Sequence, residues 1–326
     1  MLGWYERCAL LGDVEALRML SSLFYVGLDA VGIPRAARLS RRAGTILCYH
    51  NVVPDGAAGE SATPGLHMPL ARFESQVRWL ARHCEMVRLR ELVERVERGE
   101  QLLNVAAVTF DDGYVGTLQH AVPLLARLGI PATVFVIAEA PGHWDSFWWD
   151  HPHLWWDHPD LPPSIAPTRL HDMPKERWDD EHAIPCATRL RGCPPVSQCF
   201  QPADWQAIAA AARQGVDIGV HSTTHSRLPR LTDAELQREV IMSRRVIERE
   251  TGVTADFFSY PYGMWDERVK AAVRAAGYRA AVTVDPGLNR AGADPWALRR
   301  VSIPANISDA AFRAYAIGLN PRWALR

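Results

Sequence analysis

The 326-residue sequence lacks the short patterns that assign many chains to a class at once. No G-x-G-x-x-G or P-loop pattern follows a hydrophobic run, which excludes the usual nucleotide-binding loops. The six cysteines contain no C-x-x-C pair, so the common zinc and redox motifs are excluded. Neither sign of charge is in excess, with 36 basic and 37 acidic side chains, and this balance argues against a nucleic acid partner. The 12 tryptophans, by contrast, are many, and indole rings stack on carbohydrate ligands or fill large cores.

The first 43 residues are expected to form a helical extension. Apolar residues recur there at helical spacing, namely Leu10, Val14, Leu17, Phe24, Leu28 and Val31. Charged residues within this stretch argue against a secretory signal or a membrane-spanning helix, so we expect an amphipathic helix packed on the domain and a cytoplasmic location. Four arginines follow, Arg35, Arg38, Arg41 and Arg42. A peripheral contact with an anionic membrane surface therefore stays open as the alternative.

From residue 44 to about 320, two periodicities alternate. Strand-like runs occur at 45–50, 105–111, 132–137, 216–221, 255–260, 279–284 and 298–303. Helical patterns occur at 70–83, 115–128, 204–214, 232–251, 266–276 and 308–317. Polar residues gather where the strands end, which is where a barrel keeps its chemistry. The sequence therefore predicts an α/β domain, a parallel (β/α) barrel of about seven strands.

A segment at about 143–202, rich in Trp, Pro and His, interrupts this alternation. It carries a tandem near-repeat, WWDHPHL at 148–154 and WWDHPDL at 155–161. Two interpretations stay open: a cap over the barrel mouth that offers indole faces to a sugar, or a subdomain that buries its own tryptophans. Three cysteines also lie there, Cys186, Cys193 and Cys199. We expect free thiols in a reducing compartment, with pairing or metal binding as the alternative.

Two adjacent carboxylates end the strand predicted at 105–111. They are Asp111 and Asp112 in the run Thr-Phe-Asp-Asp-Gly. Neighbouring aspartates repel one another unless their roles differ or a cation lies between them. A divalent metal meets both conditions, since one carboxylate can ligate it while the other stays free as a base.

Two further strand ends supply imidazoles and a turn. His221 and His225 stand four residues apart in His-Ser-Thr-Thr-His, and neutral imidazoles suit zinc and similar ions. With the aspartate pair they predict a two-histidine, one-carboxylate metal site that leaves positions open for water and substrate. Tyr262 lies in Tyr-Pro-Tyr-Gly, a turn that can aim a backbone N–H outward, as an oxyanion hole requires.

These three motifs resemble those of the polysaccharide deacetylases with a NodB-homology domain, carbohydrate esterase family four, and the likeness covers roughly residues 44–304. The resemblance implies a distorted parallel barrel. It also implies that Asp111 is the general base and that Asp112, His221 and His225 ligate a metal, usually zinc. Members of this family remove N-acetyl groups from amino sugars by metal-assisted attack of water.

The sequence departs from the family pattern at two places. Ser259 stands where the third motif has an arginine that pairs with the catalytic aspartate, and the late Leu-x-x-His motif that supplies the general acid is absent. Along the last predicted strand Arg300 alternates with Val301 and Ile303. If the two apolar residues face the outer helices, Arg300 faces the barrel interior, where it can hold Asp111 ionised.

His50, which ends the first predicted strand, is the expected substitute for the missing acid. The run Tyr-His is similar to the motif of the poly-N-acetylglucosamine deacetylase branch, in which the acid histidine comes from the start of the chain. The alternatives are a structural role for His50 and a solvent ion pair for Arg300.

The sequence thus predicts a metal-dependent deacetylase, with zinc as cofactor and an N-acetylated amino sugar or glycan as substrate. In the expected reaction Asp111 activates water, the metal and the backbone N–H of Tyr262 stabilise the oxyanion, and His50 protonates the leaving amine. Two alternatives stay open: hydrolysis of a non-sugar amide or cyclic imide at the same site, and a catalytically silent carbohydrate-binding relative. A ferrous oxygenase is disfavoured because its usual His-x-Asp order is absent.

Overall fold

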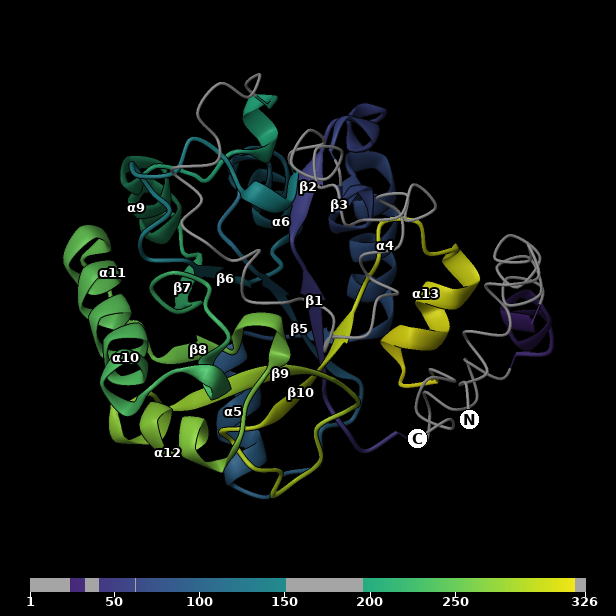
Figure 1. Ribbon diagram of the computed structural model, residues 1–326. Coiled ribbons are helices and arrows are strands. Elements are labelled where there is room, and N and C mark those ends of the chain that lie inside the picture. Colours follow the sequence, from purple (N-terminus) through teal and green to yellow (C-terminus); the bar gives the residue numbers. More distant parts are fainter. Residues whose placement is uncertain (1–23, 33–40, 62, 151–195, 320–326) are drawn as a thin grey trace, which may run out of the picture.

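The computed structural model describes residues 24–32, 41–61, 63–150 and 196–319, in which strands form a central barrel with helices around it (Figure 1). The expectations for Leu10, Val14 and Leu17, for Arg35 and Arg38, for most of the insertion, and for Cys186 and Cys193 lie outside these ranges.

Within the described residues, seven parallel strands close the barrel. Their order is β1–β10–β9–β8–β7–β6–β5, and β5 pairs back with β1. The strands are β1 (Thr45–Tyr49), β5 (Val105–Phe110), β6 (Ala132–Val136), β7 (Asp217–Val220), β8 (Phe257–Ser259), β9 (Ala280–Pro286) and β10 (Leu298–Ser302). The predicted (β/α) barrel is confirmed.

Three short strands complete the sheets. The two-residue β4 (Glu85–Met86) adds to the start of β5. Strand β2 (Asn51–Val53) continues directly from the end of β1 and pairs in parallel with β3 (His67–Pro69) as a separate two-stranded sheet. This small sheet therefore lies beside the end of the barrel at which β1 finishes.

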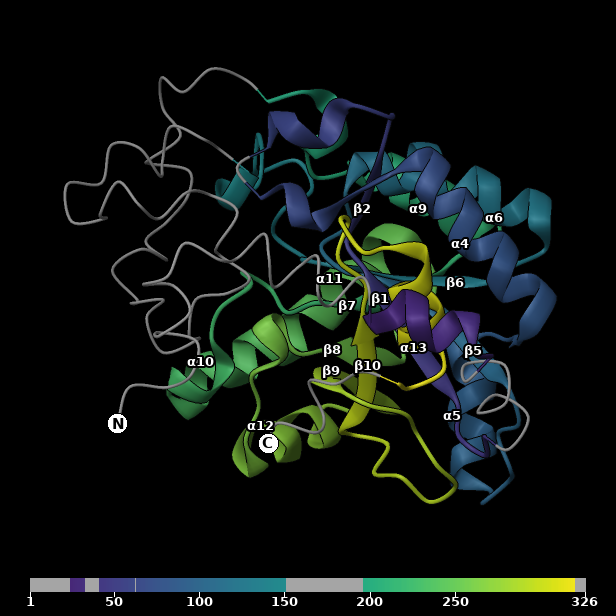
Figure 2. The ribbon, with the colours of Figure 1, turned by 90° about the vertical axis from the view of Figure 1, so that its right-hand side faces the viewer.

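Helices pack around the barrel (Figures 1 and 2). They are α4 (Leu70–His83), α6 (Val122–Leu128), α9 (Trp205–Arg213), α10 (Asp233–Gln237), α11 (Ser243–Thr251), α12 (Glu267–Ala275) and α13 (Asp309–Ala316). Side chains of Asp204, Asp266 and Ser308 accept hydrogen bonds from the first-turn amides of α9, α12 and α13, so the sequence itself sets these helix starts.

Shorter helical turns connect these elements. The π-helical turns are η3 (Thr117–Ala121), which leads into α6, and η10 (Arg238–Met242), which joins α10 to α11. The 3-10 turns are η1 (Ala57–Glu60), η2 (Pro64–Leu66), η4 (Trp148–Asp150), η8 (Gln198–Phe200), η9 (Leu228–Arg230) and η11 (Pro261–Gly263).

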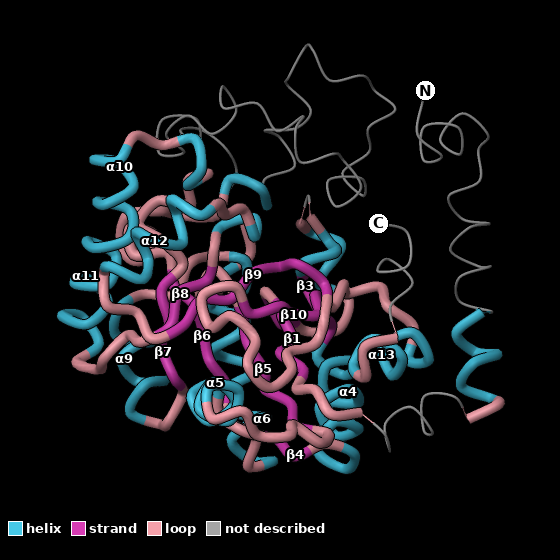
Figure 3. Tube along the Cα trace, turned by 90° about the horizontal axis from the view of Figure 1, so that it is seen from below, coloured by secondary structure: helices cyan, strands magenta, loops and turns pink. Residues whose placement is uncertain are grey.

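Side chains alternate along the strands between two hydrophobic cores. Leu47 of β1 and Val301 of β10 pack outward against the helices, while Ile46 packs inward. The helix α5 (Leu89–Glu97) adds its apolar side chains, Leu92 among them, to the inner core and so covers the end at which the strands begin (Figure 3). The opposite end is left for polar residues.

Each strand and helix predicted between residues 44 and 320 is present, with ends that agree within two residues. The helix predicted at 115–128 consists of η3 and α6, and the one predicted at 232–251 consists of α10, η10 and α11. The prediction omits β2, β3, β4 and α5. The first three are two or three residues long, too short to show a period. Helix α5 has apolar residues at helical spacing, but five of its nine residues are charged, which hides the pattern.

The predicted N-terminal stripe is wrong for two of its described members. Residues 24–30 are helical, but Phe24 is 55% and Val31 72% exposed. Tyr25 is the buried residue instead, and its ring contacts Tyr315 of α13 edge-on. Arg41 of the arginine cluster is also buried and donates to the carbonyl of Ala316, so it is not part of a solvated basic edge. Among the described helices, none is long and apolar enough to cross a membrane.

Candidate active site

Five barrel strands bring the predicted site residues together. Because parallel strands finish on the same side, β1, β5, β7, β8 and β10 deliver their last residues to one end of the barrel. The register helps to fix this convergence, since Cys48 of β1 lies opposite both Thr109 of β5 and Ser302 of β10. The site is therefore assembled from segments up to 250 residues apart in the chain.

Asp112, His221 and His225 form one cluster of donor atoms. One ligating atom of each residue lies within 4.8 Å of those of the other two. Nε2 of His221 is 3.5 Å, and Nε2 of His225 is 3.8 Å, from the same oxygen, Oδ1 of Asp112. One carboxylate and two imidazoles are a donor set for zinc and other divalent ions.

The two imidazoles have the protonation that a metal requires. Nδ1 of His221 donates to the carbonyl of Ser259 at 2.8 Å, which leaves Nε2 as the nitrogen that faces Asp112. Burial lowers the pKa of His221 and lowers that of His225 still further, with the neighbouring ring contributing to the second shift. Both rings are therefore neutral and able to ligate.

Asp112 is a buried carboxylate that needs a cation. Its burial, and then the charge of Asp111, raise the pKa of Asp112 well above the usual range. Among the described residues, no lysine or arginine forms an ion pair with it. Because an uncompensated buried charge is costly, a divalent cation held with His221 and His225 would stabilise the ionised form. The residues present thus fit a divalent metal.

Asp111 points to a different partner. Both of its carboxylate oxygens accept from the guanidinium of Arg300, at 2.8 Å from Nη1 and 2.6 Å from Nη2. Arg300 is completely buried and also donates to the carbonyl of Thr283 and the hydroxyl of Thr109. The alternation of side chains along β10 predicts this contact between Arg300 and Asp111. It has two parallel hydrogen bonds, the strongest geometry for an arginine and a carboxylate.

The ion pair determines the charge of Asp111. Burial alone would raise the pKa of the carboxyl, but the charge of Arg300 and its hydrogen bonds to Asp111 outweigh burial and hold this pKa well below its usual range. Asp111 and Asp112 therefore differ in their surroundings, although they are adjacent in sequence. The positive charge of Arg300 keeps Asp111 ionised, whereas Asp112 faces the candidate metal position.

Ser259 occupies the place at which the family motif has arginine. Its hydroxyl accepts from Nη2 of Arg300 at 2.9 Å and donates to Oδ2 of Asp111 at 3.3 Å. A serine is small enough to leave room for the guanidinium that arrives from β10. The departure at Ser259 and the presence of Arg300 thus belong to one arrangement.

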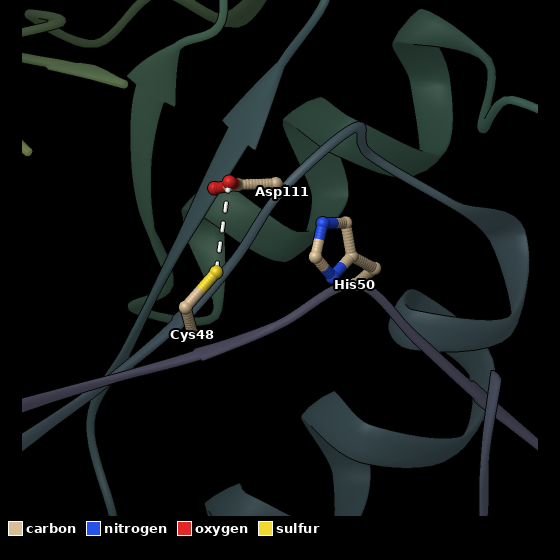
Figure 4. Close-up of side chains that lie close together, drawn as sticks. All are labelled: Cys48, His50 and Asp111. Atoms are coloured by element: carbon tan, nitrogen blue, oxygen red, sulfur yellow. Dashed lines mark hydrogen bonds between the residues drawn. The ribbon is translucent and has the colours of Figure 1, made fainter. Parts of the chain in front are cut away.

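A third group of side chains lies beside the same carboxylate (Figure 4). Donor atoms of Cys48, His50 and Asp111 all lie within 4.8 Å of one another, and the Cys48 thiol donates to Oδ2 of Asp111 at 3.7 Å. Burial raises the pKa of the Cys48 thiol well above its usual value, so it is a protonated donor. His50 therefore lies beside the carboxylate of Asp111, and its role as the acid stays a prediction.

Tyr262 lies against the metal cluster from the β8 side. Its ring centroid is 4.5 Å from that of His225, and its backbone adopts φ 57° within the turn η11. The guanidinium of Arg227 lies over the Tyr262 ring, with its central carbon 5.6 Å from the ring centroid. The turn is thus held next to the candidate metal position.

Positive φ angles concentrate at this end of the barrel. Four of the five described residues other than glycine with positive φ belong to the site, namely Asp112 (73°), Ser222 (61°), His225 (61°) and Tyr262 (57°). Such conformations cost about 1–3 kcal/mol each and persist only where the surroundings hold them.

Glu239 is one residue that the sequence reasoning missed. It is buried on η10, and its Oε2 accepts from the successive amides of Thr223 and Thr224, both at 2.9 Å. Both residues lie between His221 and His225, so the carboxylate fixes the loop that makes the imidazoles converge. No local motif marks Glu239, because its partners are more than ten residues away.

Trp149 and Asp150 were also missed, at the root of the insertion. The Trp149 ring contacts His225 with centroids 5.0 Å apart, and Asp150 is completely buried. The first copy of the WWD repeat, at 148–150, was the available signal. Cys48, Cys84 and Cys199 are buried free thiols, as expected for these three residues.

A parallel (β/α) barrel that carries two adjacent, differently held aspartates and a histidine pair is the framework of a hydrolase. The chain belongs to the polysaccharide deacetylase family, whose model matches residues 99–281. It is accordingly a deacetylase of the carbohydrate esterase class. The matched range includes Asp111, Asp112, His221 and His225, and excludes His50 and Arg300.

Individual relatives are distant. The chain is 24% identical over 275 residues to YxkH of Bacillus subtilis (strain 168), a proposed polysaccharide deacetylase, covering 83% of this chain and 75% of that one. Among solved structures, it is similar to the Streptococcus pyogenes deacetylase PplD in complex with acetate, with a TM-score of 0.60, 15% identity and coverage of 86% and 100%. The structure of IcaB from Ammonifex degensii gives a TM-score of 0.59, 18% identity and coverage of 86% and 98%. At such identities these structures support the fold.

Proposed function

We propose that the chain removes the N-acetyl group from an amino sugar or an N-acetylated glycan, with a zinc ion held by Asp112, His221 and His225. The observation that carries this proposal is the pairing of Asp111 with Arg300 beside a separate two-histidine, one-carboxylate cluster. One carboxylate is thereby kept ionised and out of the donor set, which is what a general base requires.

Asp111 takes the proton of the attacking water. Arg300 holds both oxygens and so fixes the orientation of the carboxylate, while the Ser259 hydroxyl adds a third contact. The metal, when bound, supplies Lewis-acid polarisation of the acetyl carbonyl and of the water. The backbone N–H of Tyr262 contributes a donor to the developing oxyanion.

His50 supplies the proton that the leaving amine needs. An amide nitrogen leaves poorly unless it is protonated, because the tetrahedral species otherwise returns to amide. As imidazolium, His50 donates this proton while the carbon–nitrogen bond breaks, and the products are acetate and the free amino sugar. Its position beside Asp111 lets acid and base act on the same reacting group (Figure 4).

The direct test is a substrate panel. The zinc-loaded protein is incubated with N-acetylglucosamine oligomers of one to six units, and with hydantoin and succinimide as cyclic alternatives. We expect acetate and free amine in equal amounts from an oligomer. Ring opening without acetate release would instead support the cyclic imide alternative, and metal binding without any turnover would support a silent binding protein.

Arg300→Ala is expected to shift the acidic limb of the pH profile of kcat/KM to higher pH. Without the guanidinium, burial is unopposed and raises the pKa of Asp111. The base is active when deprotonated, so a higher pKa moves the onset of activity upward. Arg300→Lys, which keeps the charge, should shift the limb less. Arg299→Ala, on the exposed neighbour, is the control. An unchanged limb in Arg300→Ala would refute the pairing role.

His50→Ala is expected to lower the kcat for an N-acetyl substrate by about 10²- to 10⁴-fold. It should affect 4-nitrophenyl acetate much less, because nitrophenolate leaves without protonation. Metal content should stay unchanged. His83→Ala, in a ring that stacks on Trp79 at the end of α4, serves as the control. Equal losses on both substrates would show that His50 is not the acid.

A further inference from the structure

The two imidazoles of the donor cluster are held in different ways. Nδ1 of His221 donates to the carbonyl of Ser259 at 2.8 Å, so a hydrogen bond fixes the direction of that ring. Nδ1 of His225 is buried as well, but it has no hydrogen-bond partner among the described residues. A histidine that ligates a metal is usually oriented by a hydrogen bond at its other ring nitrogen. Within the described part of the chain, the ring of His225 must therefore be oriented in another way.

The backbone of His225 is well fixed, but the backbone alone does not direct the ring. The amide of His225 donates to the hydroxyl of Ser222 at 2.9 Å, and the two preceding amides donate to the carboxylate of Glu239. A side chain on a fixed backbone still has several staggered rotamers. The observed rotamer places Nε2 of His225 3.8 Å from Oδ1 of Asp112, and the surroundings of the ring must select it.

Three aromatic rings pack on the imidazole of His225. Its centroid lies 4.5 Å from that of Tyr262, 4.8 Å from that of His221 and 5.0 Å from that of Trp149. Tyr262 and His221 belong to the three sequence motifs of the site, whereas Trp149 comes from the root of the insertion. Close contacts between rings in a packed interior restrict rotation about the side-chain bonds. Packing thus takes the place of the hydrogen bond that orients His221.

Trp149 is itself rigidly held. Its side chain is buried, and its ring stacks on Phe147 with centroids 5.0 Å and planes 14° apart. The indole N–H donates to the phenol oxygen of Tyr114 at 2.7 Å. The stacking sets the plane of the indole, and the hydrogen bond sets its rotation within that plane. Trp149 therefore offers His225 a surface of fixed position.

A buried polar network holds Tyr114 in turn. Tyr114 donates to Oδ2 of Asp150 at 2.8 Å. Oδ1 of the same carboxylate accepts from the hydroxyls of Ser61 at 2.7 Å and Thr63 at 2.6 Å. It also lies 2.7 Å from Nε2 of His67, which belongs to β3. The root of the insertion is thereby joined to the small β2–β3 sheet beside the barrel.

We propose that Trp149 is a positioning residue for the metal site. Its ring, together with that of Tyr262, keeps the imidazole of His225 directed at the candidate metal position in place of a hydrogen bond to Nδ1. This role rests on the metal site of the proposed function. It also gives the first WWD copy, at the root of the insertion, a specific task, because that segment completes the support of a ligand that follows β7.

Removal of the ring should weaken metal binding without abolishing it. All three donor side chains remain in Trp149→Leu, but the imidazole of His225 gains rotational freedom that binding of the ion must then remove. The metal is stripped with a chelator, and the Kd for Zn²⁺ is measured by competition. We expect an increase of about 10–100-fold, the range for loss of a group that supports a ligand. Trp149→Phe, which keeps an aromatic ring, should stay within about threefold of wild type, below that range.

A second measurement reports the geometry of the ligands rather than the affinity. Cobalt(II) is added to the metal-free protein until the site is saturated, and the visible absorption spectrum is recorded, because it depends on how the donors are arranged. We expect the spectrum of Trp149→Leu to differ from that of wild type and the spectrum of Trp149→Phe to match it. A purely structural role would lower the Tm of Trp149→Leu but leave the spectrum of the folded, cobalt-loaded protein unchanged. That result would overturn the proposal.

Trp79→Leu is the matched control. Trp79 of α4 also stacks on a histidine, His83, with centroids 4.5 Å apart, but that ring is not part of the donor cluster. This exchange should leave both the zinc affinity and the cobalt spectrum unchanged. If Trp149→Leu loses its folded circular dichroism spectrum, Trp149→Met replaces it with the same expected results, because methionine adapts to an irregular space but carries no ring.

The remaining outcomes separate this inference from the proposed function. If wild type binds zinc and Trp149→Leu matches it in affinity and in cobalt spectrum, only the present inference fails. The same holds if Trp149→Phe binds as weakly as Trp149→Leu, since the aromatic ring is then not what orients His225. If wild type binds no zinc, or Asp112→Ala binds it as well as wild type, the metal site of the proposed function fails.

Discussion

Replacing Asp111 by asparagine should lower kcat by about 10²- to 10⁴-fold, the usual contribution of a general base. Asparagine is nearly isosteric with aspartate, but its amide cannot take a proton from water. The donor cluster of Asp112, His221 and His225 does not include Asp111, so the variant should keep its metal. The measurement is acetate release from an N-acetylglucosamine oligomer, with metal content determined by elemental analysis on the same sample.

Asp145→Asn, a change at an exposed carboxylate, is the control for this experiment and should leave kcat unchanged. Turnover of Asp111→Asn within about tenfold of wild type would mean that another group is the base. Loss of metal from the variant would mean that the two aspartates do not have the separate roles assigned to them.

Asp112→Ala and His221→Ala should each abolish both metal retention and deacetylation. A three-ligand site that loses one ligand keeps only two protein donors, and removal of a zinc ligand typically leaves the ion exchangeable. The barrel should survive, because both side chains lie at the polar end and outside the two hydrophobic cores. Elemental analysis after dialysis measures the metal, and circular dichroism measures the fold.

His143→Ala, at an exposed histidine, should keep full metal content and activity. A full equivalent of metal in either ligand variant would contradict the assignment. Loss of the folded circular dichroism spectrum would instead mean that the cluster is needed for folding, as it is in small zinc domains.

The sequence predicts most of the barrel because apolar residues recur with a regular period along most of its strands and helices. The alternation of Arg300 with Val301 also predicts the inward direction of the arginine, and this direction follows from geometry that any strand shares. His50 was found for the same reason, since it comes at the end of a recognisable strand. Residues whose direction follows from the alternation along a strand, or which end a strand, can therefore be predicted from the sequence alone.

Glu239 and Asp150 could not be found in this way. Glu239 lies on a π-helical turn, and its carboxylate accepts from two backbone amides and from the Thr224 hydroxyl of a loop about fifteen residues earlier. The two amide donors leave no trace in a sequence. Asp150 depends on hydroxyls and a histidine that precede it by more than 80 residues. Such contacts are set by tertiary packing, which a local period does not encode. The exposure of Phe24 and Val31 also depends on tertiary packing. The contact of Tyr25 with α13 decides which side of the N-terminal helix is buried.

The positive φ angles at the site imply a conflict between thermostability and activity. Ser222 and His225 hold the left-handed conformation within one loop, and glycine would adopt it at lower cost. A Ser222→Gly exchange would thus relieve backbone strain but lose the hydroxyl that accepts from the amide of His225 at 2.9 Å. Selection for heat resistance alone would favour such exchanges, while selection for catalysis retains the strained residues. The loop that gathers the metal donors is therefore the part of this enzyme in which adaptation to temperature is most constrained.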